Sequence, residues 1–562
     1  MSIDFKKLKD KFLFFPVGGC NFIGTNFYLY HFDGTWIAID CGLGFADKMH
    51  NPGVDILVPD LSILEKYNIK VSALIITHSH EDHIGAVCDV YDYLNCPVYV
   101  TTFSKNFLDV DILEAKIPGK IKIVEIKDTK KILKIGKFEI EFVLLTHSIV
   151  ESFALVIKTA AGTVFHTGDW KIDNNPLVGG EIDITRLEQL GESGEISALI
   201  CDSTNVLKEG DSESESSLDD SLYDIVKNKK GAVVMTTFAS NLSRMQVAYN
   251  VAKRTGRTLF FSGHSMHRIF GIAQKSGYLH DVEYCDLKDL KNAKRSEVLI
   301  LATGCQGETM ATIAKLANGK HNFFKLQKND TVIFSSKTIP GNEVQVSDVI
   351  DKLIEKNIDV VTEKDYFVHV SGHPYRGDLK KMYGWLKPKA IIPMHGNWLM
   401  LSEHVKFAKE CGIKNSLMPV NGSVISISDE FGIEHVGKVD VKSICIDGSR
   451  HIADDSKIFK ERIIVSQNGF ITCNAVVNQK GGIVCHPTID SYGIFDYSNN
   501  NDVKLIKFVE KKALSAIKPS FFAVKKKVAI GDLEKTIMNV IKNEVHKATN
   551  KLPVIRVVVK VV

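Results

Sequence analysis

Residues 77–86 read THSHEDHIGA and follow a mostly apolar run at 71–76. The run is largely aliphatic and β-branched, which predicts a buried strand with the polar cluster on the loop at its end. This loop carries four side chains of the types that bind divalent cations: His78, His80, Asp82 and His83. Imidazoles and carboxylates together suit zinc or a similar ion. A solvated turn is the alternative, but three histidines at this density are rare by chance, which favours a metal site.

Other apolar runs also end in a candidate ligand. LLTHS ends with His147 and Ser148, VFHTGDWKID contains Asp169, and WIAIDCGLGF contains Asp40. A lone His or Asp at a strand end is more often a turn former or a cap than a ligand. Several of them within one segment change that balance, because an α/β sheet brings distant strand ends to one edge. The sequence therefore predicts one metal site assembled from several loops.

The order Asp40, His78-x-His80-x-Asp82-His83, His147, Asp169 resembles that of the metallo-β-lactamase superfamily. The resemblance implies an α/β fold, namely a four-layered αββα sandwich of two mixed sheets flanked by helices. It also implies that one metal ion is held by His78, His80 and His147. Asp82 and His83 would hold a second ion, and Asp169 would bridge the two. Asp40 would orient an imidazole from behind the ligands. The superfamily alone leaves the substrate open.

Later motifs narrow the resemblance. In chain order they are ALICDSTNV at 198–206, TTFASNLSR at 236–244, ATGCQGETMA at 302–311, FSSKTIPGNE at 334–343, HVSGH at 369–373 and IIPMHG at 391–396. The series is similar to the ribonuclease J family, a member of the β-CASP branch of the superfamily, from about residue 13 to the end of the chain. Two departures are small: Asn397 stands where an acidic residue is typical, and HSIVES replaces HSIPDS from His147 onward.

The resemblance also implies roles for residues in these motifs. His395 would complete the ligand set of the second metal, while Asp82, Asp202 and His373 would be catalytic. Asp82 would accept a proton from water, and His373 would act at the leaving 3′ oxygen. Substrate phosphate would be held by His369, Val370, Ser371, Gly372, His373, Ala239, Ser240 and Asn241. The alternative is that DSTN at 202–205 is only a helix cap or turn and that the glycine-rich loops are ordinary connections.

The spacing of the candidate ligands predicts the domain organisation. His78 to Asp169 come early and His395 comes late, so a shared site requires an inserted domain between them. The predicted parts are a first core segment at 1–204, an inserted β-CASP domain at 205–366, a second core segment at 367–428, a linker at 429–442 and an α+β C-terminal domain at 443–562. Within the insert, apolar strands at 232–235, 258–261, 298–302 and 331–334 alternate with amphipathic stretches, which predicts a parallel α/β layer.

Two further segments carry structural predictions. The acidic, serine-rich stretch at 211–220 is expected to be a surface loop. In the C-terminal domain, strands are expected near 462–465, 470–477 and 554–562, around two helices. The last strand, VIRVVVKVV, is apolar enough to be an aggregation hazard if exposed. We therefore expect it to pair inside its sheet or against another chain.

Composition limits the class of protein. At 562 residues, the chain is expected to contain three or four domains. It lacks an apolar run of about eighteen residues, and its start, MSIDFKKLKDKF, lacks a signal core, so we expect neither membrane spanning nor secretion. Eleven cysteines without a CxxC pair predict reduced thiols and a cytoplasmic location. A net charge of +3 does not by itself indicate nucleic-acid binding, and the candidates for a local basic channel are Lys525, Lys526 and Lys527.

The resemblance implies a metal-dependent ribonuclease in RNA processing and decay, including rRNA processing and mRNA decay. It implies 5′-to-3′ exonuclease action on 5′-monophosphate RNA together with endonuclease cleavage. The implied cofactors are two divalent ions, Zn²⁺ with Mn²⁺ or Mg²⁺ as alternatives. The implied partners are single-stranded RNA, further copies of the chain in a homodimer or homotetramer, and RNA-decay or ribosome-associated proteins.

Two other readings stay open at this point. A small-molecule hydrolase of the same fold, such as a thioesterase or lactonase, would have neither the inserted domain nor the HVSGH loop. A non-enzymatic RNA-binding relative would lack some of the ligands.

Overall fold

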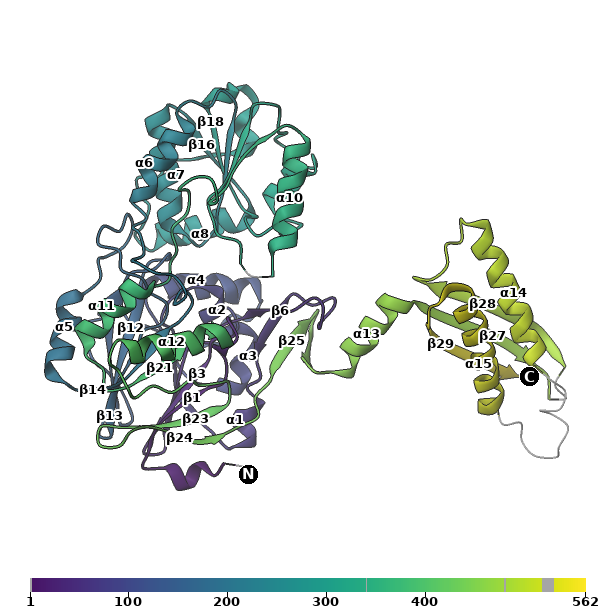
Figure 1. Ribbon diagram of the computed structural model, residues 1–562, viewed down its shortest axis with the longest axis horizontal. Helices are drawn as coiled ribbons and strands as arrows, with labels where there is room; N and C mark the ends of the chain where they lie inside the picture. The colour runs from purple at the N-terminus through teal and green to yellow at the C-terminus, as the bar shows by residue number, and fades with distance from the viewer. Residues whose placement is uncertain (1–2, 340, 480–481, 518–529) are drawn as a thin grey trace. The chain divides into compact units, whose positions relative to one another are not determined.

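The computed structural model describes residues 3–339, 341–479, 482–517 and 530–562 (Figure 1). The predicted basic candidates Lys525, Lys526 and Lys527 lie outside the described residues. The chain divides into two compact units. The larger contains Met1–Phe45 and Ile56–Ile444, and the smaller contains Ala46–Asp55 and Cys445–Val562.

The core of the larger unit contains two mixed sheets. Within the described residues, one has eight strands in the order β24 (Gly432–Lys438), β23 (Ser423–Ser428), β1 (Phe12–Pro16), β3 (Tyr28–Phe32), β4 (Thr35–Ile39), β7 (Val71–Ile75), β8 (Val98–Val100) and β9 (Ile123–Glu125). The other has six, in the order β10 (Leu133–Ile135), β11 (Phe138–Leu145), β12 (Ser152–Thr159), β13 (Gly162–His166), β14 (Ile196–Asp202) and β21 (Ile391–Met394). The strands β4, β7, β8 and β9 run parallel, as do β13, β14 and β21.

The two sheets pack face to face through a shared apolar core. Phe14, Ile37 and Ile75 of the first sheet and Leu155 and Ile200 of the second belong to one buried cluster. Because alternate residues of a strand point to opposite faces, the other face of each sheet also needs a cover. Helices α5 (Ile184–Ser193), α11 (Arg376–Leu386) and α12 (Trp398–Glu410) cover the second sheet.

Helices near the first sheet bury apolar side chains and complete the four predicted layers: α1 (Ser62–Lys66), α3 (Val87–Leu94) and α4 (Thr102–Glu114). Shorter elements complete the core, namely α2 (Glu81–Ile84), the strand pair β2 (Cys20–Asn21) and β22 (Gly396–Asn397), and the strand pair β5 (Gly44–Phe45) and β6 (Ile56–Pro59). The fold is thus the predicted metallo-β-lactamase sandwich.

The inserted domain is a parallel α/β layer, as predicted. Its strands follow the order β17 (Cys285–Asp286), β16 (Thr258–Ser262), β18 (Val298–Ala302), β15 (Val233–Thr236), β19 (Thr331–Phe334) and β20 (Asp359–Val361), and each strand pairs parallel with its neighbours. Helices α9 (Thr312–Ala317) and α10 (Glu343–Glu355) pack on one face, and α6 (Ser217–Val226), α7 (Leu242–Thr255) and α8 (His264–Lys275) lie on the other (Figure 1).

The smaller unit has its own apolar core. Strands β28 (Ile483–Tyr492), β27 (Phe470–Val477) and β29 (Val554–Val561) form its sheet in that order, and α14 (Asn500–Ala516) and α15 (Ile530–Thr549) cover one face. Its first elements are β25 (Ser443–Asp447), β26 (Arg450–Ala453) and α13 (Lys457–Asn468). Strand β29 pairs with β27 on one side and is an edge strand of the described sheet, so the expectation that it pairs inside the sheet holds for one side only.

The predicted strand at 462–465 is wrong, because these residues lie inside α13. The Ser456 hydroxyl accepts a hydrogen bond from the Ile458 N–H at the start of the helix, and Gly469 ends it with a positive φ of 79°. Both are signals of helix ends, and they outweigh the strand preference of the β-branched residues between them.

Two predicted loops contain regular structure. The linker prediction at 429–442 is contradicted by β24, which pairs antiparallel with β23 at the edge of the eight-stranded sheet. The expected surface loop at 211–220 runs only to the start of α6, and Glu215 within it is fully buried. The physical reason is an ion pair between Glu215 and the buried Arg244.

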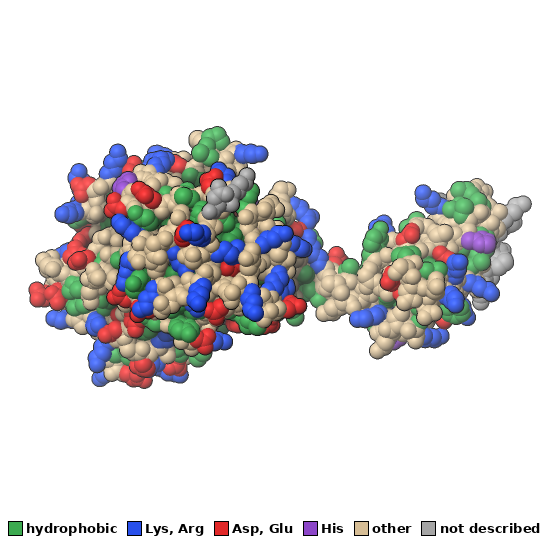
Figure 2. Space-filling model, turned by 90° about the horizontal axis from the view of Figure 1, so that it is seen from above, with side chains coloured by type: hydrophobic (Ala, Val, Ile, Leu, Met, Phe, Trp, Pro, Cys, Tyr) green, Lys and Arg blue, Asp and Glu red, His purple; other side chains and the backbone are tan. Residues whose placement is uncertain are grey.

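None of the described helices combines the length and hydropathy that a bilayer crossing requires. On the face shown in Figure 2, Lys and Arg side chains lie interspersed with Asp and Glu, which agrees with the small net charge.

Candidate metal centre

Three imidazoles gather where β7 and β11 end. His78, His80 and His147 offer nitrogen atoms that lie within 4.8 Å of one another. The His147 Nε2 is 3.0 Å from the His80 Nδ1, and the His147 Nδ1 is 2.6 Å from the Gly372 carbonyl oxygen. A hydrogen bond to that carbonyl fixes the ring orientation of His147 and leaves its Nε2 for a cation. This is the group that the resemblance implies for the first metal ion.

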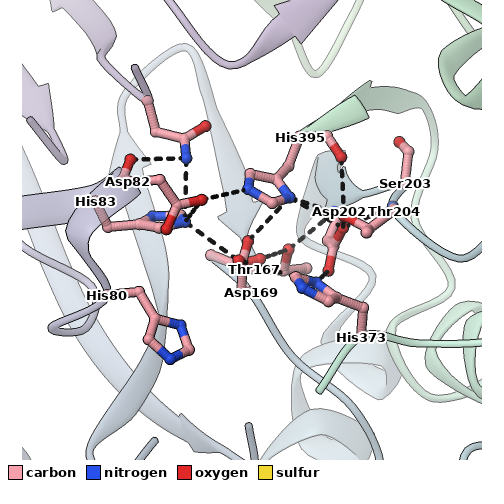
Figure 3. Close-up of polar contacts among 12 residues, drawn as sticks. His80, Asp82, His83, Thr167, Asp169, Asp202, Ser203, Thr204, His373 and His395 are labelled. Carbon is pink, nitrogen blue, oxygen red and sulfur yellow. Dashed lines mark hydrogen bonds and ion pairs between the residues drawn. The ribbon is translucent and has the colours of Figure 1, made fainter. Parts of the chain in front are cut away.

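A second group shares the same sheet edge. Asp82, His83, Asp169 and His395 offer ligand atoms within 4.8 Å of one another (Figure 3). The His83 Nε2 lies 3.2 Å from an Asp169 oxygen, and the His395 Nε2 lies 3.1 Å from an Asp82 oxygen. Asp169 is also 4.0 Å from the His147 Nε2, so its carboxylate stands between the two groups.

Asp40 lies behind these ligands and is fully buried. Its carboxylate accepts hydrogen bonds from the Thr77 N–H at 2.8 Å and from the His83 Nδ1 at 2.7 Å. The Thr77 contact anchors the loop that carries His78 and His80. The His83 contact leaves Nε2 facing the centre, which is the orienting arrangement that the resemblance implies for Asp40.

Asp202, at the end of β14, joins the centre from the other side. One of its oxygens lies 2.7 Å from the His373 Nδ1, and the other accepts hydrogen bonds from the Thr204 N–H at 2.8 Å and hydroxyl at 2.7 Å. The Thr204 hydroxyl is also 2.8 Å from the His395 Nδ1. Asp202, His373, His395 and Asp169 form a third cluster of candidate ligand atoms. Of the alternative for 202–205, a helix cap or a turn, the turn is partly right, since Asp202 accepts a hydrogen bond from the Thr204 N–H and the next helix begins only at Ser217.

The charges of the two groups differ. Burial holds the pKa of His78 and His147 well below the ordinary value and lowers that of His80 to about 4. These imidazoles are therefore neutral, the form that binds a metal. Burial opposes charge at His395 as well, yet the carboxylates of Asp169, Asp202 and Asp82 raise the pKa of His395 to about 10. The pKa of His83 is likewise well above its ordinary value. Burial opposes this rise, and the negative charge of Asp169 is its main cause.

This pattern fits a divalent cation. Within the described residues, the ion pairs of Asp82, Asp169 and Asp202 are all with histidines. The carboxylates therefore hold protons on imidazoles in place of a fixed positive charge, and a bound cation would displace those protons. The His78 Nε2 and the Asp169 Oδ1, two atoms of predicted ligands, are buried and have no hydrogen-bond partner in the part of the chain that the structure describes.

The predicted phosphate-binding residues separate into two sets. In the HVSGH loop, 369–373, the Ser371 hydroxyl accepts a hydrogen bond of 2.6 Å from Asn205, and Val370 is buried. Gly372 lies so close to His147 that an added Cβ would be 2.8 Å from the ring. The Nδ1 of His369 is buried and has no hydrogen-bond partner among the described residues. Its pKa is well below the ordinary value, first through burial and then through Arg244 and three lysines.

The second set lies in the FASN segment, 238–241. Ala239 and Ser240 line a pocket of about 260 Å³ that Ser79 and Glu81 of the metal-ligand loop also line. Asn241 is engaged elsewhere, because its side chain caps α7 by accepting a hydrogen bond of 2.8 Å from the Arg244 N–H and donates to Glu215 at 3.2 Å.

Several supporting residues were not foreseen from the sequence. They are Thr77, Thr204, Asn205 and the Glu215–Arg244 pair, together with Asn26, whose amide nitrogen lies 3.1 Å from the His83 Nε2. Thr77 adjoins His78, and Thr204 and Asn205 belong to the DSTN motif at 202–205, which is a usable signal. Nothing in the sequence pattern points to Asn26 or Glu215.

Family models match most of the larger unit and much of the smaller one. Residues 20–102 match "Metallo-beta-lactamase superfamily" and residues 230–353 match "Ribonuclease J, beta-CASP domain". Residues 357–419 match "Zn-dependent metallo-hydrolase RNA specificity domain", and residues 457–562 match "Ribonuclease J C-terminal domain". A small-molecule hydrolase of this fold would lack the inserted domain, so the match at 230–353 argues against that alternative. A non-enzymatic relative would lack some ligands, whereas all the predicted ligands lie within the clusters described above.

Curated relatives match over most of their length. Ribonuclease J of Sinorhizobium meliloti is 34% identical over 98% of this chain and 97% of its own. Ribonuclease J of Mycolicibacterium smegmatis is 35% identical over 82% of each chain. Among solved structures, a protein of unknown function from Enterococcus faecalis is 16% identical with a TM-score of 0.52, over 74% of this chain and all of its own, which supports the fold alone.

Proposed function

The chain belongs to the ribonuclease J family, and from that premise we propose that it is a divalent-metal-dependent ribonuclease that hydrolyses phosphodiester bonds of single-stranded RNA. One observation carries the proposal. Two groups of ligand atoms meet around Asp169, and the HVSGH loop touches one of them through the Gly372 carbonyl oxygen and His147. A site for cations and a candidate site for phosphate are therefore adjacent.

The proposed cofactors are two divalent ions, Zn²⁺ with Mn²⁺ or Mg²⁺ as alternatives, held by His78, His80, His147, Asp82, His83, Asp169 and His395. Such ions act as Lewis acids toward a phosphoryl oxygen and make an attacking water more acidic. The mixed nitrogen and oxygen donors favour zinc, and the carboxylates also suit the harder ions.

Asp82 and His373 are the proposed proton carriers. The Asp82 side chain is 29% exposed, against 2% for Asp169, so Asp82 is the better placed acceptor for a proton from water. His373 is 22% exposed and is held through Nδ1 by Asp202, which leaves its Nε2 available to donate a proton to the leaving 3′ oxygen. Asp202 acts by orienting His373 and raising its pKa, although burial opposes that charge.

The finer activity is also part of the proposal: 5′-to-3′ exonuclease action on 5′-monophosphate RNA, with internal cleavage as a second mode. The unpartnered His369 Nδ1 and the cationic side chains near it support binding of a terminal phosphate. Ser371, Gly372, Ala239 and Ser240 are the proposed further contacts. Asn241 acts indirectly, because its side chain caps α7.

The proposal extends to cellular context. We place the enzyme in RNA processing and decay, as a homodimer or homotetramer. A cytoplasmic location is supported by the cysteines of the described residues, all of which are free thiols.

The test uses the purified chain and a single-stranded RNA labelled at its 3′ end, carrying a 5′ monophosphate. We expect cleavage that stops with chelator and returns with added Zn²⁺ or Mn²⁺, with released mononucleotides and progressively shortened 3′-labelled products. Labelled intermediates of discrete length without mononucleotides would support endonuclease action instead. Cleavage that persists at full rate in chelator would contradict the metal-dependent mechanism.

A further inference from the structure

The inserted domain touches the core along helix α4. Helix α8 of the insert lies against α4 (Figure 1), and polar contacts cross between them. The Asn106 amide donates a hydrogen bond of 2.8 Å to Ser276, and the Arg268 guanidinium pairs with Asp111 and packs 4.8 Å from the centre of the Phe107 ring. These contacts hold the insert at one end of the core sandwich.

One contact reaches further, into the segment that follows His147. The Tyr278 hydroxyl donates a hydrogen bond of 3.0 Å to one oxygen of Glu151. The other oxygen of Glu151 accepts a hydrogen bond of 2.8 Å from the Phe103 N–H at the start of α4. Glu151 is thus held between the inserted domain and the core.

Backbone strain marks Glu151 as a positioned residue. Its φ is 56°, in the left-handed region that is unfavourable for a residue with a side chain. Such a conformation persists only where surrounding contacts stabilise it. The two hydrogen bonds to its carboxylate are those contacts.

The residues next to Glu151 connect to three metal-ligand loops. His147, four positions earlier, is itself a proposed ligand. Ser152 donates a hydrogen bond of 2.8 Å to the Asp169 carbonyl oxygen, and the Phe153 N–H donates one of 3.2 Å to the Thr77 carbonyl oxygen, next to His78. A shift of residue 151 would therefore move ligands from all three loops.

We propose that Tyr278 is a positioning residue of the metal centre: through Glu151 it ties the inserted domain to the segment 147–153 and fixes the loops of His78, His147 and Asp169. The idea rests on the proposed function. It means that the placement of the insert, which helps to line the pocket beside these loops, also sets the geometry of the ligands. Arg268 adds a second link, since it lies 3.9 Å from Glu81, the neighbour of Asp82.

The experiment compares Tyr278→Phe with Tyr284→Phe in the full chain. Tyr284 is a matched control, because its hydroxyl lies 3.2 Å from the Nδ1 of His267, a residue of its own domain. We measure kcat and KM on single-stranded RNA, the metal retained per chain at a fixed free Zn²⁺ concentration, and the thermal unfolding midpoint. Changes behind metal ligands typically cost about 10- to 100-fold in metal affinity or activity.

For Tyr278→Phe we expect kcat to fall about tenfold with KM within about twofold, and metal retention to fall, while Tyr284→Phe stays near the parent. Glu151→Gly, which fits the positive φ, should reproduce the loss, and adding Tyr278→Phe to it should cost nothing more. Unchanged metal retention in Tyr278→Phe, or a loss confined to thermal stability, would overturn the inference. If the parent itself does not cleave RNA, the proposed function fails, and metal retention still decides the role of Tyr278.

Discussion

The larger unit contains two buried networks of charged side chains, which differ in the residue type that pairs with the carboxylates. In the metal centre, Asp82, Asp169 and Asp202 are paired with histidines, whose charge depends on protonation. Beside the HVSGH loop, Glu215 is paired with Arg244 at 3.0 Å, and both side chains are almost fully buried. A guanidinium keeps its proton at every ordinary pH.

The difference indicates what each network is for. Imidazoles can give up protons to a cation, so the first network can exchange its positive charge for metal ions. The second network cannot exchange its positive charge in this way, because that charge belongs to a guanidinium. Its hydrogen bonds instead hold the backbone: Arg244 donates to the carbonyl oxygens of Ser335 and Val368, and Val368 precedes His369. We infer that the first network serves the chemistry and the second holds the FASN segment and the HVSGH loop in place.

The largest expected effect comes from removing ligands. His80→Ala combined with Asp82→Ala should reduce RNA cleavage by roughly 10³-fold or more, because the contribution of the metal ions is lost. The fold should persist, since His80 and Asp82 lie at the start of the short helix α2 at a sheet edge and not in an apolar core. The matched control is His50→Ala with Asp47→Ala, an exposed His–Asp pair. Circular dichroism checks the fold, and full activity in the double variant at 80 and 82 would refute the assignment.

The second network should matter most for stability. Arg244→Met leaves Glu215 buried without its partner and should lower the free energy of unfolding by about 3 to 5 kcal/mol. Arg254→Met, which breaks the more exposed pairs with Asp219 and Asp220, should cost much less, because solvent screens exposed ion pairs. Urea unfolding of both variants measures this. Equal stabilities would show that the buried pair has no special structural role.

The HVSGH loop should discriminate between RNA ends. If Ser371, Gly372 and the flanking histidines bind a terminal monophosphate, a triphosphate must desolvate more charge without enough donors. Exonuclease rates on 5′-monophosphate RNA should exceed those on 5′-triphosphate RNA by about tenfold, measured on otherwise identical substrates. Equal rates on the two ends would leave the HVSGH loop with a structural role only.

The smaller unit contains neither kind of network in its described part, where its core is apolar. Removing residues 443–562 should shift the protein toward monomer and weaken cleavage several-fold, by about three- to tenfold, with all metal ligands still present. Sedimentation and RNA cleavage measure the two effects. A truncated chain that sediments and cleaves like the full one would make this unit dispensable for both.

The smallest expected effect concerns Asp111. This carboxyl group pairs with an arginine, Arg268, but its own charge depends on pH. Burial, Glu81 and Glu114 outweigh the attraction of Arg268 and raise the pKa of Asp111 to about 7. Because this pKa lies above the unfolded value, the carboxyl group favours the folded state most at low pH, and that contribution is lost as pH rises toward 7. Asp111→Asn should therefore raise the unfolding temperature at pH 8 relative to the parent, but not at pH 4. The opposite order would show that the Arg268 ion pair dominates.

The clustering of the candidate ligands could be predicted from the sequence, for a physical reason. Each proposed ligand follows an apolar strand, and parallel neighbouring strands such as β4 and β7 deliver their ends to one edge. Short-range pattern and sheet geometry therefore place Asp40 beside the loop of His78. The packing of the two sheets against each other then brings His147 and Asp169 to the same edge.

Features set by helix ends or by long-range packing were missed. The RIIV run at 462–465 has a strand preference but lies in a helix set by Ser456 and Gly469. Strand β28 contains Pro487 and many polar residues, and it is tolerated because it lies at a sheet edge. The segment Ala46–Asp55 belongs to the smaller unit, where Arg462 donates to the Pro52 carbonyl oxygen across 410 positions of sequence.

The most direct test of the account is a titration of metal-free protein with Zn²⁺ and, separately, Mn²⁺, in which bound metal per chain and RNA cleavage are measured on the same samples. We predict no cleavage in the metal-free protein, with activity rising until two ions are bound per chain. The variant with His80→Ala and Asp82→Ala should bind fewer ions and stay inactive. Cleavage at the full parental rate with far less than one bound ion per chain would contradict the claim that the histidine and aspartate loops form a metal centre for RNA hydrolysis.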